Sequence, residues 1–248
     1  METIYVMWLR QLKRYWRSKP RMLGSLAQPI LFLVALGFGF GPIFQKAGGG
    51  NYIEFLAPGI IAMSILFTSV FTGIEVIWDR QFGFLKETLV APVTRTRIMI
   101  GRALGGATVG TLQGIVVFLI CLLIGFRPDN WLYLPFALVF MFLIALLFTT
   151  LGTAIASRLN DMQAFPLIIN FLIMPVFFLS GALFPLDGLP SAINIISSLN
   201  PLSYGVDGLR YAFTGVAHFP VIVSLSVVFL VAAAFTALGA YMFSKIEI

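Results

Sequence analysis

The segment DRQFGFLKETLVAPVTRTRIMIG, residues 79–101, is the one long charged stretch between two runs of apolar residues. Each flanking run is long enough to cross a bilayer, which takes about 20 residues. A charged segment between two spans must lie in water or against another protein. Its basic excess places it on the cytoplasmic side, because short cytoplasmic loops are rich in Lys and Arg. The charged residues are Arg80, Lys86, Arg95 and Arg97 against Asp79 and Glu87.

The composition indicates an integral membrane protein. Of the 248 residues, 59% are hydrophobic and only 10% are charged, whereas soluble domains have about 25% charged residues. The net charge of +6 could suggest a nucleic-acid partner. The basic residues flank the apolar runs, however, so they are better explained as topology signals. We therefore expect contact with membrane lipid and no nucleic acid.

We expect an all-α membrane protein that forms a single transmembrane domain over residues 1–248. The six apolar runs predicted to span the membrane are 22–44, 55–77, 98–126, 131–157, 165–183 and 219–243. The segment 184–218 contains apolar pieces that are too short to span, so a re-entrant helical pair is predicted there. Glycines in the first half of the third run, from Gly101 to Gly114, predict the close approach of another helix.

Residues 1–21 are predicted to form an amphipathic helix at the membrane interface that ends at Pro20. At 100° per residue, its aromatic and aliphatic residues share one face, and its arginines and lysine lie on the other. Trp8 and Trp16 are the expected interfacial anchors, because indole rings favour the headgroup layer.

The distribution of Lys and Arg predicts that both termini are cytoplasmic. With six spans and the N-terminus inside, only Lys46, Arg127 and Arg210 of the 16 Lys and Arg residues fall outside. The expected location is the cytoplasmic membrane of a bacterium or archaeon.

Several classes of chemistry have no support in the sequence. No phosphate-binding loop G-x-x-x-x-G-K-[ST] occurs, so we expect this chain to bind no cofactor. The one histidine, His218, lies at a span boundary, and Cys121 lies alone within an apolar run. An ion-coupled carrier or channel remains an alternative, although it would require ionisable groups along a pore. An intramembrane enzyme would need a His, Asp or Glu constellation at depth.

The segment LKETLVAPVTRTRIMIGR, residues 85–102, resembles the stretch after the second span of ABC type-2 transporter permeases, notably daunorubicin-resistance-like and lipo-oligosaccharide export permeases. FLAPGII (55–61) and LNPLSYGVDGLRY (199–211) resemble two further stretches of that family. The resemblance implies an exporter subunit that moves an amphipathic, lipid-like, drug-like or glycolipid substrate out of the cytoplasm or inner leaflet. It also implies a homodimer of permeases and a separate ATP-binding cassette subunit that carries ATP and Mg²⁺.

Within this resemblance, a coupling helix at residues 79–92, stopped by Pro92, is expected to dock on the ATP-binding subunit. Its predicted contact residues are Arg80, Phe82, Phe84, Leu85, Lys86 and Glu87. The second and fifth spans are expected to build the substrate path, with Asn170 as a buried amide. The predicted path residues are Ser64, Phe67, Thr68, Phe71, Asn170, Phe171, Phe177 and Phe178.

Overall fold

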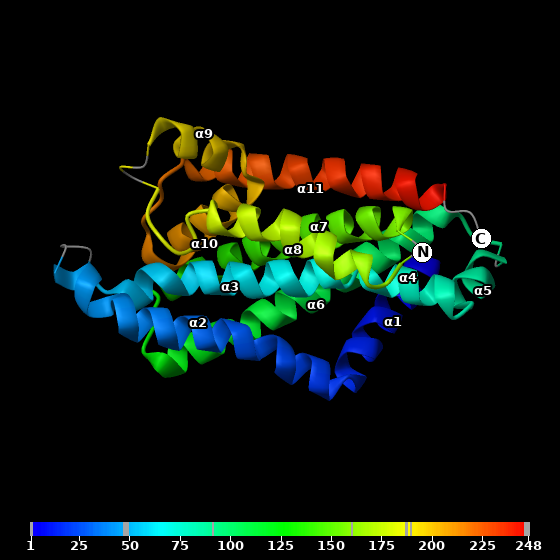
Figure 1. The fold of residues 1–248 in the computed structure, drawn as a ribbon, viewed down its shortest axis with the longest axis horizontal. Coiled ribbons are helices and arrows are strands. Elements are labelled where there is room, and N and C mark those ends of the chain that lie inside the picture. The colour runs from blue at the N-terminus through cyan, green and yellow to red at the C-terminus, as the bar shows by residue number, and fades with distance from the viewer. Residues whose placement is uncertain are drawn as a thin grey trace.

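The computed structural model describes residues 2–46, 50–90, 92–159, 161–186, 188 and 190–245, without the side chains of Lys86 and Leu89. Every regular element in these ranges is helical (Figure 1). The helices are α1 Glu2–Arg17, α2 Lys19–Lys46, α3 Tyr52–Phe71, α4 Ile74–Gln81, α5 Phe84–Val90, α6 Arg95–Ile124, the 3₁₀ turn η1 Trp131–Tyr133, α7 Leu134–Arg158, α8 Ala164–Phe178, α9 Ser191–Leu199, α10 Pro201–Thr214 and α11 Val221–Ser244.

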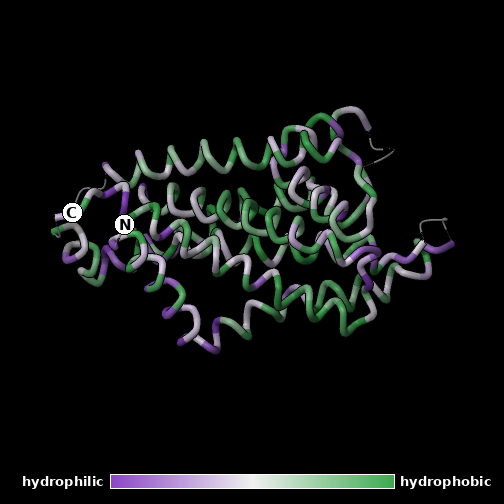
Figure 2. Tube along the Cα trace, turned by 180° about the vertical axis from the view of Figure 1, so that it is seen from behind, coloured by the Kyte–Doolittle hydropathy of each residue, from purple (hydrophilic) through white to green (hydrophobic). Residues whose placement is uncertain are grey.

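Five helical stretches in the described ranges are long and apolar enough to cross a membrane: Lys19–Lys46, Tyr52–Gln81, Arg95–Ile124, Trp131–Arg158 and Val221–Ser244. Their hydrophobic residues run along the middle of the bundle, and hydrophilic residues collect towards its two ends and along α1 (Figure 2). The all-helical membrane fold is thus confirmed. Helix α8 has 15 residues and is about 22 Å long, shorter than a hydrocarbon core of about 30 Å. The sixth span stays a prediction.

Helix α7 lies at the centre of the bundle, where it packs against α3, α6, α10 and α11. Near its C-terminal end it approaches the junction of α3 and α4 so closely that the backbones touch. A Cβ on Gly73 would overlap the backbone of Gly152, and a Cβ on Gly152 would overlap the carbonyl of Val70. Glycine at both positions therefore allows two helices to meet with no side chain between them.

Helix α8 packs on α3 through one stripe of side chains and leaves its other face uncovered. The buried stripe repeats every four residues: Phe165, Ile169, Ile173 and Phe177. Rings meet edge to face across this contact, with centroids 6.2 Å apart for Phe71 and Phe165 and 6.4 Å apart for Phe67 and Phe177. Asn170 lies on the exposed face. Within this chain Asn170 is not buried, because it follows a stripe residue directly and so points away from α3. Its place on a substrate path stays a prediction.

Two short helices, α9 and α10, lie at the end of the bundle away from α5 (Figure 1). Asn200 separates them: its Oδ1 accepts from the N–H of Leu202, and its Nδ2 donates to the carbonyl of Val176. Helix α10 is buried against α3, α7 and α11. Helices are thus present where the re-entrant pair is predicted, and their depth in a bilayer stays a prediction.

Two predicted boundaries differ from the structure. The first helix ends at Arg17, and Pro20 lies in the first turn of α2, where its missing N–H breaks no helical bond. The single coupling helix from residue 79 is also wrong. Asp79 belongs to α4, and Gly83, with a φ of 81°, turns the chain into α5.

The glycine contact between α7 and the α3–α4 junction gives a stability prediction. Gly152→Ala should destabilise the protein by about 1–3 kcal/mol, because the added methyl forces two backbones apart. Gly39→Ala is the matched control, since Gly39 also lies within a helix and a Cβ there meets nothing within 4 Å. It should leave stability unchanged or slightly raised. Thermal unfolding in detergent measures both, and equal midpoints would contradict the contact.

Candidate functional site

Four arginines surround two carboxylates where α1, α2, α4 and α6 meet. Asp79 lies at the centre with only 1% of its side chain exposed, and Arg102, with 3% exposed, donates to it at 2.7 Å. The remaining ion pairs are Arg10 to Asp79 at 3.0 Å, Arg14 to Asp79 and to Glu75 at 3.4 Å each, and Arg21 to Glu75 at 2.8 Å. This arginine–carboxylate network ties the N-terminal helix to α4, and α4 leads directly into α5.

Helix α1 reaches this position because α6 presents glycines to it. Ideal Cβ atoms on Gly101 and Gly105 would lie 2.7 Å from the Cβ of Met7 and 2.6 Å from that of Gln11. The close approach predicted from these glycines is confirmed. Trp8 is half-buried and donates from Nε1 to Oγ1 of Thr108 at 3.0 Å.

Trp16, the other predicted anchor, is exposed on α1. One predicted anchor therefore contacts α6, and the other is 71% exposed. The location of α1 in the bilayer plane stays a prediction.

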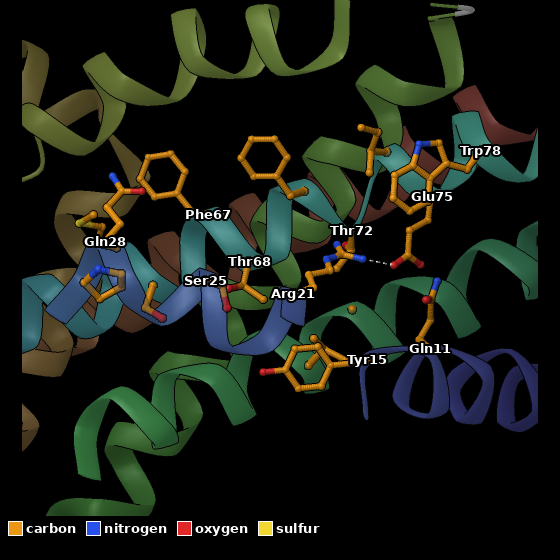
Figure 3. A pocket seen from close by; sticks show the side chains of 18 residues that line it. Gln11, Tyr15, Arg21, Ser25, Gln28, Phe67, Thr68, Thr72, Glu75 and Trp78 are labelled. Atoms are coloured by element: carbon orange, nitrogen blue, oxygen red, sulfur yellow. Dashed lines mark hydrogen bonds and ion pairs between the residues drawn. The ribbon is translucent and has the colours of Figure 1, made fainter. Parts of the chain in front are cut away.

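A cavity of about 440 Å³ opens beside the network, between the α1–α2 arm and α3–α4 (Figure 3). Glu75, Trp78 and Gln11 lie at one end, and Phe67 and Gln28 lie towards the other. Between them are Thr68, Thr72 and Arg21, whose guanidinium points towards Glu75. The lining residues are Gln11, Tyr15, Arg21, Gly24, Ser25, Gln28, Pro29, Met63, Ser64, Phe67, Thr68, Phe71, Thr72, Ile74, Glu75, Trp78, Gly106 and Val109.

Tyr15 joins the cavity wall to α6. Its hydroxyl donates to Oε1 of Gln113, which is fully buried. Burial raises the pKa of Tyr15 above its usual value, although the nearby cation of Arg21 acts in the opposite direction. The phenol therefore keeps its proton at neutral pH and remains a hydrogen-bond donor.

Several groups on the cavity wall keep unused hydrogen-bonding capacity. The Oγ of Ser64 and the Nε1 of Trp78 are buried without a partner among the described residues. Buried polar groups without partners are uncommon in proteins and are typical of sites that bind a ligand or ordered water. Arg21, whose side chain is 34% exposed, uses Nη1 for Glu75, and none of the described residues accepts from its Nε or Nη2.

The predicted path residues separate into two groups. The four from the second span, Ser64, Phe67, Thr68 and Phe71, all line this cavity. Those from the fifth span do not. Phe177 is buried behind Phe67, and Phe178 lines a separate apolar cavity of about 410 Å³ beside Phe184. Asn170 and Phe171, the latter 86% exposed, face outwards from α8.

The predicted docking residues also separate. Phe82 and Phe84 are 70% and 52% exposed at the α4–α5 turn, and Glu87 is exposed on α5. Leu85 is instead buried in the core. Arg80 is half-buried, because it donates to the carbonyls of Ser157 and Leu159 at the end of α7. The side chain of Lys86 lies outside the described part of the structure.

The sequence reasoning missed the ion network, although its signal is visible. Glu75 and Asp79 are four residues apart, and so are Arg10 and Arg14. Residues at this spacing lie on one face of a helix. Each helix thus presents two charges of one sign on one face, and the two charges of one helix can pair with the two opposite charges of the other.

Comparison with known proteins finds similarity to one family of membrane transporters along most of the chain. A family model described as ABC-2 type transporter matches residues 2–214. Nodulation protein J of Rhizobium leguminosarum bv. viciae is 31% identical over 196 residues, which are 78% of this chain and 75% of that protein. The inner membrane transport permease YadH of Escherichia coli K12 is 28% identical over 233 residues, or 91% of this chain and 89% of that protein.

The buried pair of Asp79 and Arg102 should matter for stability far more than the exposed pairs. Asp79→Asn leaves the Arg102 cation buried without a carboxylate, which typically costs about 3–5 kcal/mol. Arg10→Gln should cost at most about 1 kcal/mol, since Arg10 is one-third exposed. Asp129→Asn, at an exposed residue, is the neutral control. Unfolding in detergent compares the three, and similar losses for Asp79→Asn and Asp129→Asn would contradict this role.

Proposed function

Because the chain belongs to the ABC-2 type transporter family, we propose that it is the membrane-spanning permease subunit of an ATP-driven exporter. A separate ATP-binding cassette subunit supplies ATP and Mg²⁺, and docks at the α4–α5 turn. The observation that carries the proposal is the pair of exposed phenylalanines, Phe82 and Phe84, on the polar segment between two helices of spanning length.

The α4–α5 segment suits docking because its aromatic residues are exposed while its base is fixed. Leu85 is buried and Arg80 is bonded to the end of α7, so the turn is held against the bundle. Phe82 and Phe84 point away from that base and lack cover. Exposed apolar side chains on a polar surface commonly mark a protein interface. Movement of a bound partner would therefore reach α4 and the ion network directly.

A second copy of the permease is proposed to cover the outer face of α8. Phe171 is largely exposed there and Asn170 lies beside it. An amide on a lipid-facing surface leaves its hydrogen bonds unmade, and pairing across helices satisfies them. The symmetric contact of two α8 helices would give the homodimer expected from the resemblance.

The orientation follows from charge. The N-terminal end of α1, the C-terminal end of α11 and the α4–α5 segment lie at the same end of the bundle (Figure 1). The basic residues concentrate in these segments, so this end is proposed to face the cytoplasm of a bacterial or archaeal cell. The cavity then opens at the cytoplasmic half of the membrane, where an amphipathic or lipid-like substrate would enter.

Docking is tested by purification of the tagged permease from native membranes. The native chain should retain a subunit that carries a G-x-x-x-x-G-K-[ST] loop. The double variant Phe82→Ser, Phe84→Ser should lose it, because the aromatic contact is gone, while folding is unaffected by changes at exposed residues. Leu132→Ser, at an exposed residue of η1, is the control and should retain the subunit. Retention by the double variant would refute docking at this turn.

Charge reversal on α5 tests coupling separately from assembly. Glu87→Lys should lower transport at least about tenfold while ATP hydrolysis by the assembled complex continues, because the partner's complementary charge is now repelled. Glu54→Lys, at an exposed residue of α3, is the control for charge alone. Normal transport by a well-expressed Glu87→Lys permease would count against a coupling role for this residue.

The dimer is tested by disulfide formation in a Cys121→Ser background. Cysteines at positions 170 and 171 should crosslink two permease copies, since both side chains lie on the exposed face of α8. A cysteine at position 177 is the control: its side chain is buried against Phe67 and should not crosslink. Exclusive labelling of positions 170 and 171 by lipid-phase reagents would place the dimer contact elsewhere.

A further inference from the structure

The ion network beside the cavity is asymmetric in charge. Its four arginines face only two carboxylates, which leaves two positive charges in excess, and of these six residues Arg21 and Glu75 line the cavity itself. The carboxylates are already fully engaged: Glu75 accepts from Arg14 and Arg21, and Asp79 accepts from Arg10, Arg14 and Arg102. Neither acid is free to neutralise a cation brought by a ligand.

Arg21 is the network member best placed to meet a ligand. It lies in the first turn of α2 and lines the cavity, with its guanidinium beside Glu75 and towards Thr72 (Figure 3). One edge of the guanidinium is used for Glu75, and Nε and Nη2 have no acceptor among the described residues. A free edge of this kind binds phosphate, sulfate or carboxylate through paired hydrogen bonds.

Away from Arg21, hydroxyl and apolar side chains of α3 line the cavity side by side: Thr68 follows Phe67, and Ser64 follows Met63 one turn further on. The Oγ of Ser64 has no partner among the described residues. A ligand that matches this lining has an acidic group at Arg21 and a mainly apolar chain beyond it. The volume of about 440 Å³ lies in the range of small-molecule sites.

We propose that this cavity binds an anionic amphiphile, with its acidic head group on Arg21 and its chain against Met63 and Phe67. The inference rests on the proposed function and specifies the substrate class of that transporter. The excess positive charge disfavours a cationic amphiphile. A small hydrophilic anion would gain the arginine but would leave the apolar wall unused.

The test is binding to the purified permease in a neutral-lipid nanodisc, without any ATP-binding subunit. The probe is a decyl phosphate brominated along its chain, which quenches the fluorescence of Trp78, a residue of the cavity wall. Trp78→Phe identifies the quenching that belongs to the cavity. That component should saturate with decyl phosphate, and brominated decyl glucoside and brominated decyltrimethylammonium should not produce it at the same concentrations.

Two variants locate the head group and the chain. Arg21→Gln should raise the half-saturation concentration at least about tenfold, the loss expected for a charge-assisted contact. Arg17→Gln, at the exposed last residue of α1, should leave it unchanged. Thr68→Phe fills the cavity with the ion network intact and should also abolish saturable quenching. Leu119→Phe, at an exposed residue of α6, should not.

Equal binding of the neutral or cationic probe would overturn the proposal, as would unchanged binding in both Arg21→Gln and Thr68→Phe. Inorganic phosphate that competes as well as unlabelled decyl phosphate would also overturn it, because the chain would then contribute nothing. Since no ATP-binding subunit is present, these failures would leave the docking proposal standing. Loss of docking with anion-selective binding retained would instead refute only the ATP-driven function.

Discussion

The buried ion pair between Asp79 and Arg102 is the interaction on which the end of the bundle formed by α1, α4 and the start of α6 depends. It fixes α4 against α6, and the oxygens of Asp79 also receive Arg10 and Arg14 from α1. A charged pair at low exposure is favourable only when its remaining hydrogen-bonding groups are satisfied. Arg10 and Arg14 donate to the remaining acceptor sites of Asp79, whereas Nη2 of Arg102 is buried without a partner among the described residues. The pair therefore depends on contacts from α1 as well as from α4 and α6.

Two features of the molecule lie beside this ion pair. The α4–α5 turn exposes Phe82 and Phe84 on one side of it, and the cavity opens on another. The path between them is short, because Glu75 lines the cavity and Asp79 lies one helical turn further along α4. A transporter of the proposed kind needs such a connection between a docking surface and a substrate site. The packing of Gly73 on Gly152 keeps α4 close to the central helix while it makes this connection.

The sequence predicts the helical membrane architecture well, because apolar length and the glycines of α6 are local properties. Five of the expected spans have matching helices, and Gly101 and Gly105 receive α1. Local pattern fails where a residue's partner is distant in sequence. The local pattern places Asp79 in a charged segment between two spans. It does not reveal that Asp79 is paired with Arg10 and Arg14, which lie 69 and 65 residues away in the sequence. The sequence also predicts a buried amide at Asn170, because hydropathy does not reveal which face of α8 packs against α3.

The separation between those partners also bears on how the chain is made. Synthesis proceeds from the N-terminus, so Arg10 and Arg14 leave the ribosome well before the carboxylates that later bind them. During that interval their charges are uncompensated, and uncompensated Lys and Arg hold a segment on the cytoplasmic side of the membrane. In the proposed orientation, the same side chains would serve first as a topology signal and afterwards, once α4 is in place, as structural ligands of Glu75 and Asp79. The proposed orientation would then be set before the charges that set it are neutralised.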